Sequence, residues 1–407
     1  MNIYINNPIT NKLTTKAEGI KNSNKQFSDI IDNEGNQYVD LVQEGGGVLG
    51  IALVGYTYIL EKAGIRFYSL AGTSAGSINA LLIAGMDKVG VNVSEKILEV
   101  LSKQNLFDFV DGPKGIKKLI QKKIDGKKGI GFSIAWNAFS IYKSLTQKMG
   151  INPGNTFEEW LNNILDKNGI LTYKDLERLR LEIPSLSNRI NGEPLTTPPK
   201  LALVTSEVST HTKADFPRMA GLYWKDINTI KPAKFARASM SIPFFFYPFT
   251  LNNIPNAGNS ADSNWQKFAS YNGEIPKTIR FVDGGMLSNF PIGIFHKTDG
   301  EMPSRPTFGA RLSTYRDTYS NTDSVAGLSG AMISTMRQIF DYDFILRNPD
   351  FKQLICNIDA DKKFNWLNFN MTEAKKVELF QLGAKKGLEF LEKFDWENYK
   401  KHRAKIA

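Results

Sequence analysis

Cysteine, histidine and long apolar runs are all scarce in this sequence. Its 407 residues include one cysteine, Cys356, which excludes an internal disulfide framework and a cysteine-rich zinc site. Three histidines leave little material for a histidine-based metal site, and we expect no metal and no cofactor. The most apolar early stretch, residues 48–60, contains a glycine and is well short of the ~20 residues that span a bilayer.

We also expect no targeting signal at the amino terminus. Residues 1–36 are polar and rich in asparagine, with no apolar core of the signal-peptide type. The sequence does not begin with Met-Gly, so it lacks the signal for N-myristoylation. We therefore expect a cytoplasmic protein that can associate peripherally with a membrane.

Basic residues outnumber acidic ones. The sequence has 51 Lys and Arg against 41 Asp and Glu, a formal net charge of +10. Such an excess favours anionic partners, which include membrane surfaces, nucleic acids and acidic ligands. No nucleic-acid-binding module is recognisable, and we expect no nucleic-acid partner. The oligomeric state is left open by the sequence.

Two segments bear on lipid binding. Residues 113–128 combine lysines with apolar residues at helical spacing, so they could bind an anionic membrane surface or simply pack on the domain with solvated lysines. Residues 242–249 are dense in aromatics and could line an acyl-chain channel, touch a bilayer or bury their rings in the core. The lysines that would face a membrane surface in the first case are Lys114, Lys117, Lys118, Lys122 and Lys123.

Strands and helices alternate in the first part of the chain. The pattern predicts a strand at 38–43, a helix at 51–62, a strand at 66–70 and a helix at 77–84, with a glycine-rich turn after each strand. This order predicts an α/β fold with three α/β/α layers and a mainly parallel central sheet. Further strands are expected at 200–208, 278–283, 307–312 and 353–359.

The composition divides the chain into three parts. Residues 1–36 form a polar N-terminal extension, residues 37–360 the α/β domain, and residues 361–407 a charged helical segment with one amphipathic helix at 372–399. Within the α/β domain, residues from about 88 to 199 are rich in lysine and asparagine and have a helical pattern. This change in composition and pattern predicts a helical cap inserted into the sheet domain.

A serine lies on a glycine turn between a predicted strand and a predicted helix. The segment Gly72-Thr-Ser74-Ala-Gly76 matches Gly-x-Ser-x-Gly, in which small residues permit the strained turn that exposes a nucleophilic hydroxyl. The following helix directs the positive end of its dipole towards this serine. A serine that merely caps the helix is the simpler interpretation, but the position between strand and helix favours a nucleophile.

The turn after the first strand is also rich in glycine. Residues 45–50 match Gly-x-Gly-x-x-Gly, the pattern of dinucleotide sites, but the acidic residue expected at the end of the second strand is missing. Successive glycines expose backbone N–H groups that can stabilise an oxyanion. We therefore rank an oxyanion hole first, a plain tight turn second and a dinucleotide site third.

A serine nucleophile needs a base, and the histidines are poorly placed to supply it. One precedes the candidate acid, and the other two lie outside the kind of loop in which a triad histidine is expected. Asp283 ends a predicted strand and precedes Gly284 and Gly285, and it could accept the serine proton if burial raises its pKa. On its own, Asp-Gly-Gly usually marks a turn. The histidines are His211, His296 and His402.

Taken together and in order, these blocks resemble the patatin-like phospholipases. The resemblance covers roughly residues 38–312 and is weakest in the expected cap. It implies a Ser-Asp dyad that acts on lipid esters without a histidine. The blocks that carry it are the glycine loop 45–50, the serine turn 72–76, Asp283-Gly284-Gly285, residues 236–243, and the run through Asn289 and Pro291.

The resemblance also implies a role for each matching residue. It makes Ser74 the nucleophile and Asp283 the base. The sequence departs from the usual family pattern at Glu44, where many members have Asp, and at Leu49, where many have Arg or Lys. Leucine at position 49 removes a positive charge near the site, so the expectation of a phosphate-containing substrate is weaker than the expectation of ester hydrolysis. The implied oxyanion donors are Gly45, Gly46 and Gly47, and the other motif glycines are Gly50, Gly72, Gly76, Gly284 and Gly285.

The expected function is that of a phospholipase A-type lipid acyl hydrolase. Such an enzyme cleaves ester bonds of membrane glycerolipids through an acyl-serine intermediate. The same site would also suit an acyltransferase or a neutral-lipid esterase. A catalytically idle scaffold that binds lipid is a further alternative.

Overall fold

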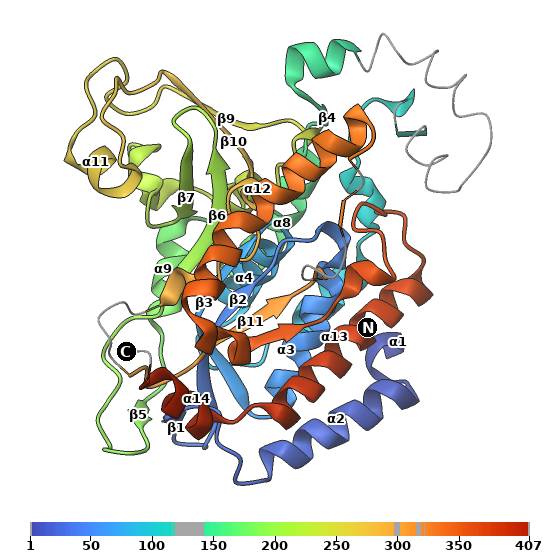
Figure 1. Cartoon of the computed structure of the whole chain (residues 1–407), viewed down its shortest axis with the longest axis vertical. Coiled ribbons are helices and arrows are strands. Elements are labelled where there is room, and N and C mark those ends of the chain that lie inside the picture. The colour runs from blue at the N-terminus through green and yellow to red at the C-terminus, as the bar shows by residue number, and fades with distance from the viewer. Residues whose placement is uncertain are drawn as a thin grey trace.

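A large sheet forms the centre of the molecule in the computed structural model (Figure 1), which describes residues 2–115, 117–118, 142–296, 302–314, 319–320 and 322–405. Seven strands, each hydrogen-bonded to the next, follow one path through this sheet. No helix among the described residues is long and apolar enough to cross a bilayer. The strands on the path are β12 (Ile355–Asn357), β11 (Thr307–Arg311), β2 (Gln37–Gln43), β3 (Ile65–Thr73), β6 (Leu201–Glu207), β10 (Thr278–Asp283) and β9 (Phe249–Asn252).

Most of the sheet is parallel, as the sequence predicts. Strands β12, β11, β2, β3 and β6 run in the same direction, whereas β10 is antiparallel to both β6 and β9. The antiparallel strands were not expected. Three more strands lie off the path, namely β1 (Ile30–Asp32), β5 (Leu186–Asn188) and β7 (Thr212–Phe216), and a separate pair is formed by β4 (Gly150–Asn152) and β8 (Phe244–Phe246).

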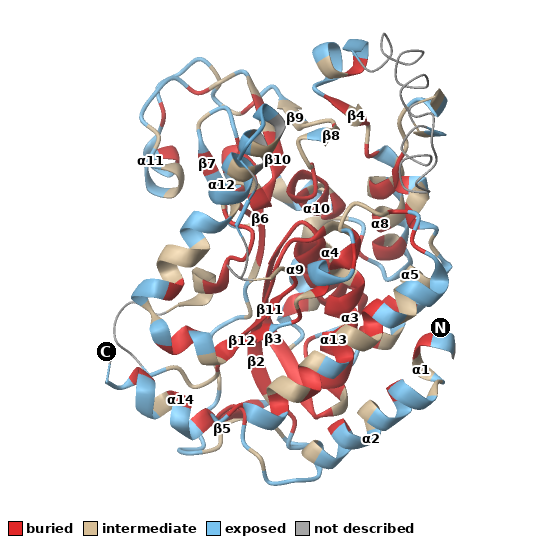
Figure 2. Cartoon of the chain, turned by 45° about the vertical axis from the view of Figure 1, so that its right-hand side comes forward, coloured by how far each residue is buried: buried red, intermediate tan, exposed pale blue. Residues whose placement is uncertain are grey.

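Helices cover both faces of the sheet. Helix α3 (Gly50–Lys62) connects β2 to β3, and α4 (Ala75–Met86) lies in the connection from β3 to β6. Both connections lead to the next strand in the same direction across the sheet. Right-handed crossovers place these two helices on one face. Helix α12 (Val325–Arg347) joins β11 to β12 in the opposite direction, which places it on the other face. The predicted α/β/α layers are therefore confirmed, and Figure 2 shows the sheet as buried strands between them.

The region expected to form a cap contributes helices that pack near α3 and α4. Helix α5 contacts both α3 and α4, and α8 packs mainly against α10. The region also contains two short strands, β4 and β5, which the helical pattern did not predict. The helices described in the expected cap are α5 (Ser94–Lys103), α8 (Asn155–Lys167) and α9 (Tyr173–Leu181). Helices α10 (Ala233–Ser239) and α11 (Ser263–Ala269) follow it in the chain.

Both ends of the chain pack against α3. The helix predicted at 372–399 is two helices, α13 (Glu373–Lys393) and α14 (Trp396–Arg403), because the Asp395 side chain caps a new helix by accepting from the Asn398 N–H. Helix α13 lies along α3, and α2 (Pro8–Lys21) packs on both after the short α1 (Asn2–Ile5). The terminal segments therefore belong to the layer that covers one face of the sheet.

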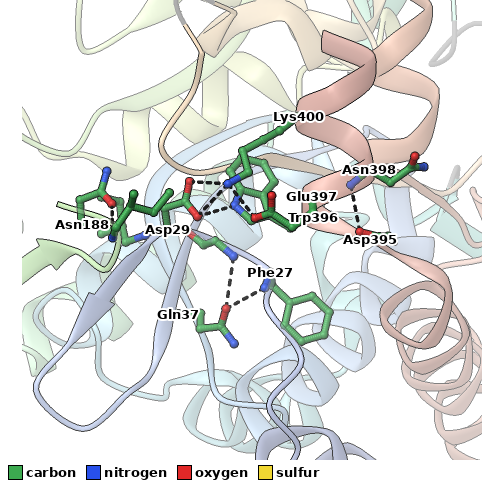
Figure 3. Close-up of polar contacts among 12 residues, drawn as sticks. Phe27, Asp29, Gln37, Asn188, Asp395, Trp396, Glu397, Asn398 and Lys400 are labelled. Atoms are coloured by element: carbon green, nitrogen blue, oxygen red, sulfur yellow. Dashed lines mark hydrogen bonds and ion pairs between the residues drawn. The ribbon is translucent and has the colours of Figure 1, made fainter. Parts of the chain in front are cut away.

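A buried ion pair joins the two ends (Figure 3). The Asp29 carboxylate accepts hydrogen bonds from Trp396 Nε1 at 2.8 Å and from Lys400 Nζ at 3.1 Å. Nearby, Gln37 at the start of β2 accepts from the Phe27 N–H at 2.7 Å. Because Asp29 is only 4% exposed, loss of Lys400 would remove the cation that pairs with its carboxylate in the interior.

Close packing of α3 and α13 depends on glycines, and this gives a stability prediction. A β-carbon at Gly383 would overlap the Ala52 carbonyl oxygen, so Gly383→Ala must push the helices apart. We expect Gly383→Ala to lower the free energy of unfolding by about 1–3 kcal/mol, the usual cost of overpacking. Denaturant unfolding would measure this change.

Gly19→Ala in α2 is the matched control. Nothing lies within 4 Å of a β-carbon at Gly19, and alanine favours a helix over glycine. This control should leave stability unchanged or slightly raised. Equal stability of the two variants would contradict the packing argument.

Candidate active site

Ser74 stands on a strained turn between β3 and α4. Its backbone has φ 50° and ψ −117°, a conformation that non-glycine residues rarely adopt. A β-carbon at Gly72 would collide with the backbone of Gly76, and one at Gly76 with the Gln43 carbonyl group, so both positions require glycine. The Ser74 N–H donates to Ser239 Oγ at 2.8 Å, which ties the turn to the end of α10.

Strands β3 and β10 meet end to end along one edge of β6. Strand β3 pairs with residues 201–204 of β6 and β10 with residues 205–207. Strand β7 pairs with residues 203–207 and so shares β6 residues with each of them, which places β7 on one edge of β6 and both β3 and β10 on the other. Along the shared edge, Thr73 pairs with Val204 and Asp283 pairs with Thr205. The carboxyl ends of the two strands therefore meet where Ser74 follows β3 and Asp283 completes β10.

Asp283 is buried and hydrogen-bonded at this junction. Its carboxylate interacts with the Ser74 side chain and accepts a hydrogen bond from the Gly285 N–H at 2.8 Å. Burial raises the pKa of the Asp283 carboxyl above its ordinary value, while the positive charge of Arg337 and the interactions with Ser74 and the Gly285 N–H oppose the rise. A carboxylate with a raised pKa beside a serine hydroxyl can act as a general base towards that hydroxyl.

The glycine loop lies beside this pair. Gly46 and Gly47 line the same cavity as Ser74 and Asp283, and no described residue accepts a hydrogen bond from their N–H groups. The Gly45 N–H instead donates to the Asn289 carbonyl oxygen at 2.9 Å. Of the three glycines that the resemblance implies as oxyanion donors, Gly45 therefore has its N–H engaged within the protein.

Glu44 holds the loop in place. Its buried carboxylate accepts from the Leu312 N–H at 2.6 Å, from the Ser313 N–H at 2.8 Å and from Asn289 Nδ2 at 3.0 Å. These bonds connect the end of β2 to the end of β11 and to the loop after Asp283. Glutamate at position 44 is thus fully used as an acceptor of hydrogen bonds from its neighbours.

Helix α12 contributes two residues that the sequence analysis missed. Arg337 Nη2 donates to Asn289 Oδ1 at 2.9 Å, and its guanidinium lies 5.4 Å from the centre of the Trp366 ring. Asp341 accepts from Ser288 Oγ and from the Phe290 N–H, each at 2.7 Å, and burial raises its pKa to about 7. No local pattern marks either residue, since each acquires its partners only when α12 docks on the loop at 288–290.

Two cavities meet at Ser74. One holds Asp283, the glycine loop and Arg337, the other runs between α3 and α4, and both are lined mainly by apolar side chains. Ser74, Gly47 and Ile242 line both. The apolar cavity is lined mainly by Val48, Ile51, Val54, Leu82, Phe109, Phe157, Trp160, Met240 and Phe246.

The three histidines lie away from Ser74. His211 is exposed in the turn between β6 and β7, His296 packs against Phe344 and Phe351, and His402 contacts Gln353. None of them lines either cavity at Ser74. Within the described part of the chain, no three His, Cys, Asp or Glu side chains come together as a metal site.

The lysine-rich segment is described only in part. Lys114 and Lys118 are exposed, and Lys117 Nζ lies 5.0 Å from the centre of the Phe107 ring. Lys122 and Lys123 lie outside the described residues. A membrane-facing role for this segment stays a prediction.

Comparison with known proteins points to one family. The model of the patatin-like phospholipases matches residues 41–296, which include both Ser74 and Asp283. The uncharacterized protein YqhO of Bacillus subtilis (strain 168) is 28% identical over 361 residues, covering 88% of this chain and 100% of YqhO. The crystal structure of VipD from Legionella pneumophila aligns with 91% of this chain and 71% of VipD, at 16% identity and a TM-score of 0.40.

The contact of Asp283 with Ser74 predicts how the serine responds to pH. The rate at which a fluorophosphonate labels Ser74 should fall as pH falls through the pKa of Asp283, because a protonated carboxyl cannot accept the serine proton. Since burial raises this pKa, the midpoint should lie above the ordinary aspartate value of about 3.9.

Arg337→Met tests the same electrostatic environment. Removing the cation should move the midpoint of Ser74 labelling to higher pH, because Arg337 favours the ionised form of Asp283. Arg337→Lys keeps the charge and should leave the midpoint near that of the wild type. An unchanged midpoint in a folded Arg337→Met variant would contradict this account.

Proposed function

This chain belongs to the patatin-like phospholipase family, and we propose that it is a phospholipase A-type enzyme that cleaves ester bonds of membrane glycerolipids. Membership of the family indicates lipid acyl hydrolase activity. The observation that carries the finer proposal is the contact of the Ser74 hydroxyl with the buried Asp283 carboxylate at the mouth of an apolar cavity. This arrangement combines a nucleophile, a base and space for an acyl chain.

In the proposed reaction, Asp283 takes the proton of Ser74 as the hydroxyl oxygen attacks the ester carbonyl. The negative charge that develops on the carbonyl oxygen is stabilised by the N–H groups of Gly46 and Gly47. Gly45 is the weaker candidate donor, because Asn289 already accepts from its N–H. Gly45 instead holds the loop against the segment that follows Asp283.

Collapse of the intermediate completes the first half of the reaction. The bond to the alcohol oxygen breaks, Asp283 returns its proton to that oxygen, and the acyl group stays on Ser74. A water molecule then attacks the acyl-serine while Asp283 takes its proton; the bond to the Ser74 oxygen breaks, Asp283 gives the proton to that oxygen, and the fatty acid leaves. Transfer of the acyl group to another alcohol would use the same steps, so acyl transfer is the alternative closest to hydrolysis.

The two cavities suit the two parts of a glycerolipid. The apolar cavity between α3 and α4 would take the acyl chain, since its lining offers hydrocarbon contacts. The other cavity would take the glycerol and headgroup, since it holds the guanidinium of Arg337 and the Asp283 carboxylate among residues that are otherwise mainly apolar. Arg337 supplies a positive charge in a site where Leu49 supplies none, which favours phospholipids over neutral lipids.

A direct test of the proposed function is lipid analysis of the Ser74→Ala variant. Mass spectrometry of a phospholipid mixture incubated with the wild-type protein should show free fatty acid and lysophospholipid. Ser74→Ala should release neither above background, because alanine has no nucleophile. The product would also show which ester position is cut. Release that persists in Ser74→Ala would remove the nucleophile assignment, and an inactive wild type would favour the scaffold alternative.

A second test separates the dyad from an ordinary triad. Asp283→Asn should lower turnover by several orders of magnitude while leaving the fold intact, since an amide fills the same space and cannot accept the proton. Replacing His211, His296 and His402 together should keep the rate within about tenfold, equal to roughly 1.4 kcal/mol of barrier. A folded histidine variant as inactive as Ser74→Ala would show that the catalytic class is wrong.

A further inference from the structure

Helix α12 exposes far more apolar surface than any other element described. Of the nineteen large hydrophobic residues that are exposed in the described chain, eight lie on this helix. Figure 1 shows α12 running across the front of the molecule, and Figure 2 colours it mostly exposed or intermediate. These eight residues are Val325, Leu328, Met332, Ile333, Met336, Ile339, Phe340 and Leu346.

From Val325 to Phe340 this face carries almost no charge, and an exposed ion pair of Asp343 with Arg347 lies at its carboxyl end. Between Val325 and Phe340 the only ionisable side chain is that of Arg337, which points inward to Asn289 and Trp366. A helix that exposes this much apolar surface to water normally has a binding partner that covers it. The lack of charge argues against a partner bound mainly by salt bridges and favours an apolar one.

The exposed face continues into the site. Ile333 of α12 and Phe244, which is 65% exposed, line the same cavity as Ser74 and Asp283. The other end of α12 is anchored, because Asp341 accepts hydrogen bonds from the loop at 288–290. The helix therefore holds an apolar surface at a fixed position beside the entrance to the serine.

We propose that the exposed apolar face of α12, together with Phe244, inserts into the surface of a lipid bilayer and sets the entrance of the Ser74 cavity against it. The proposal rests on the proposed function, because the substrate of that reaction resides in a bilayer. An acyl chain that leaves the bilayer beside Ile333 reaches Ser74 without crossing water. A second copy of the chain is the alternative occupant of the same face.

The test compares vesicle binding and hydrolysis in two double variants of the full chain. Leu328→Glu with Met332→Glu places charge on exposed residues of α12 that do not line the cavity. Leu181→Glu with Ile190→Glu is the matched control, since both residues are more than half exposed and lie outside α12. Sedimentation with phosphatidylcholine vesicles measures binding, and a water-soluble short-chain ester measures the chemistry.

We expect the wild type and the control to bind these vesicles in both low and high salt, because an apolar contact is not screened. The α12 variant should lose at least about tenfold in binding and in hydrolysis of vesicle lipid, while its rate on the soluble ester stays unchanged. Ser74→Ala should bind like the wild type. Binding through α12 without any lipid hydrolysis would support the docking surface and refute the proposed function.

Other outcomes would overturn the proposal. Equal vesicle binding by the α12 variant and the control would do so directly. Binding that requires anionic lipid and disappears in high salt would assign docking to the lysine-rich segment instead. A wild-type dimer in light scattering that the α12 variant converts to a monomer, with no vesicle binding by either, would assign the face to a second copy.

Discussion

The end-to-end meeting of β3 and β10 on one edge of β6 is the constraint on which the candidate site depends. A serine on a strained turn and a buried carboxylate come into contact because two strands that run in opposite directions stop at neighbouring positions of a third. A shift of β10 by one residue would turn the Asp283 side chain to the other face of the sheet. The register of β10, more than the burial of Asp283 alone, is therefore what pairs the two groups.

The remaining parts of the site are arranged around this junction by a small number of polar bridges. Asn289 is one of them, and it bonds to Glu44, to both backbone groups of Gly45 and to Arg337. Through it, the glycine loop after β2, the loop after β10 and helix α12 form one network.

Local patterns predict much of the fold. The strands at 38–43 and 278–283, the helix at 51–62 and the turn at Ser74 appear where the sequence places them, because glycine, apolar spacing and strand propensity act over a few residues. The antiparallel direction of β10, the engagement of the Gly45 N–H and the position of Arg337 were beyond such patterns. Each depends on contacts between segments far apart in the chain, and no periodicity within one segment encodes them.

The dependence of the glycine loop on the carboxyl-terminal part of the chain has a consequence during synthesis. The Val48 N–H donates to the Trp366 carbonyl oxygen, and α3, which follows the loop, is covered by α13. Both partners are made more than three hundred residues after the loop itself. During synthesis the serine turn is therefore made long before the supports of the glycine loop, and an N-terminal fragment that stops short of Trp366 contains the turn without them.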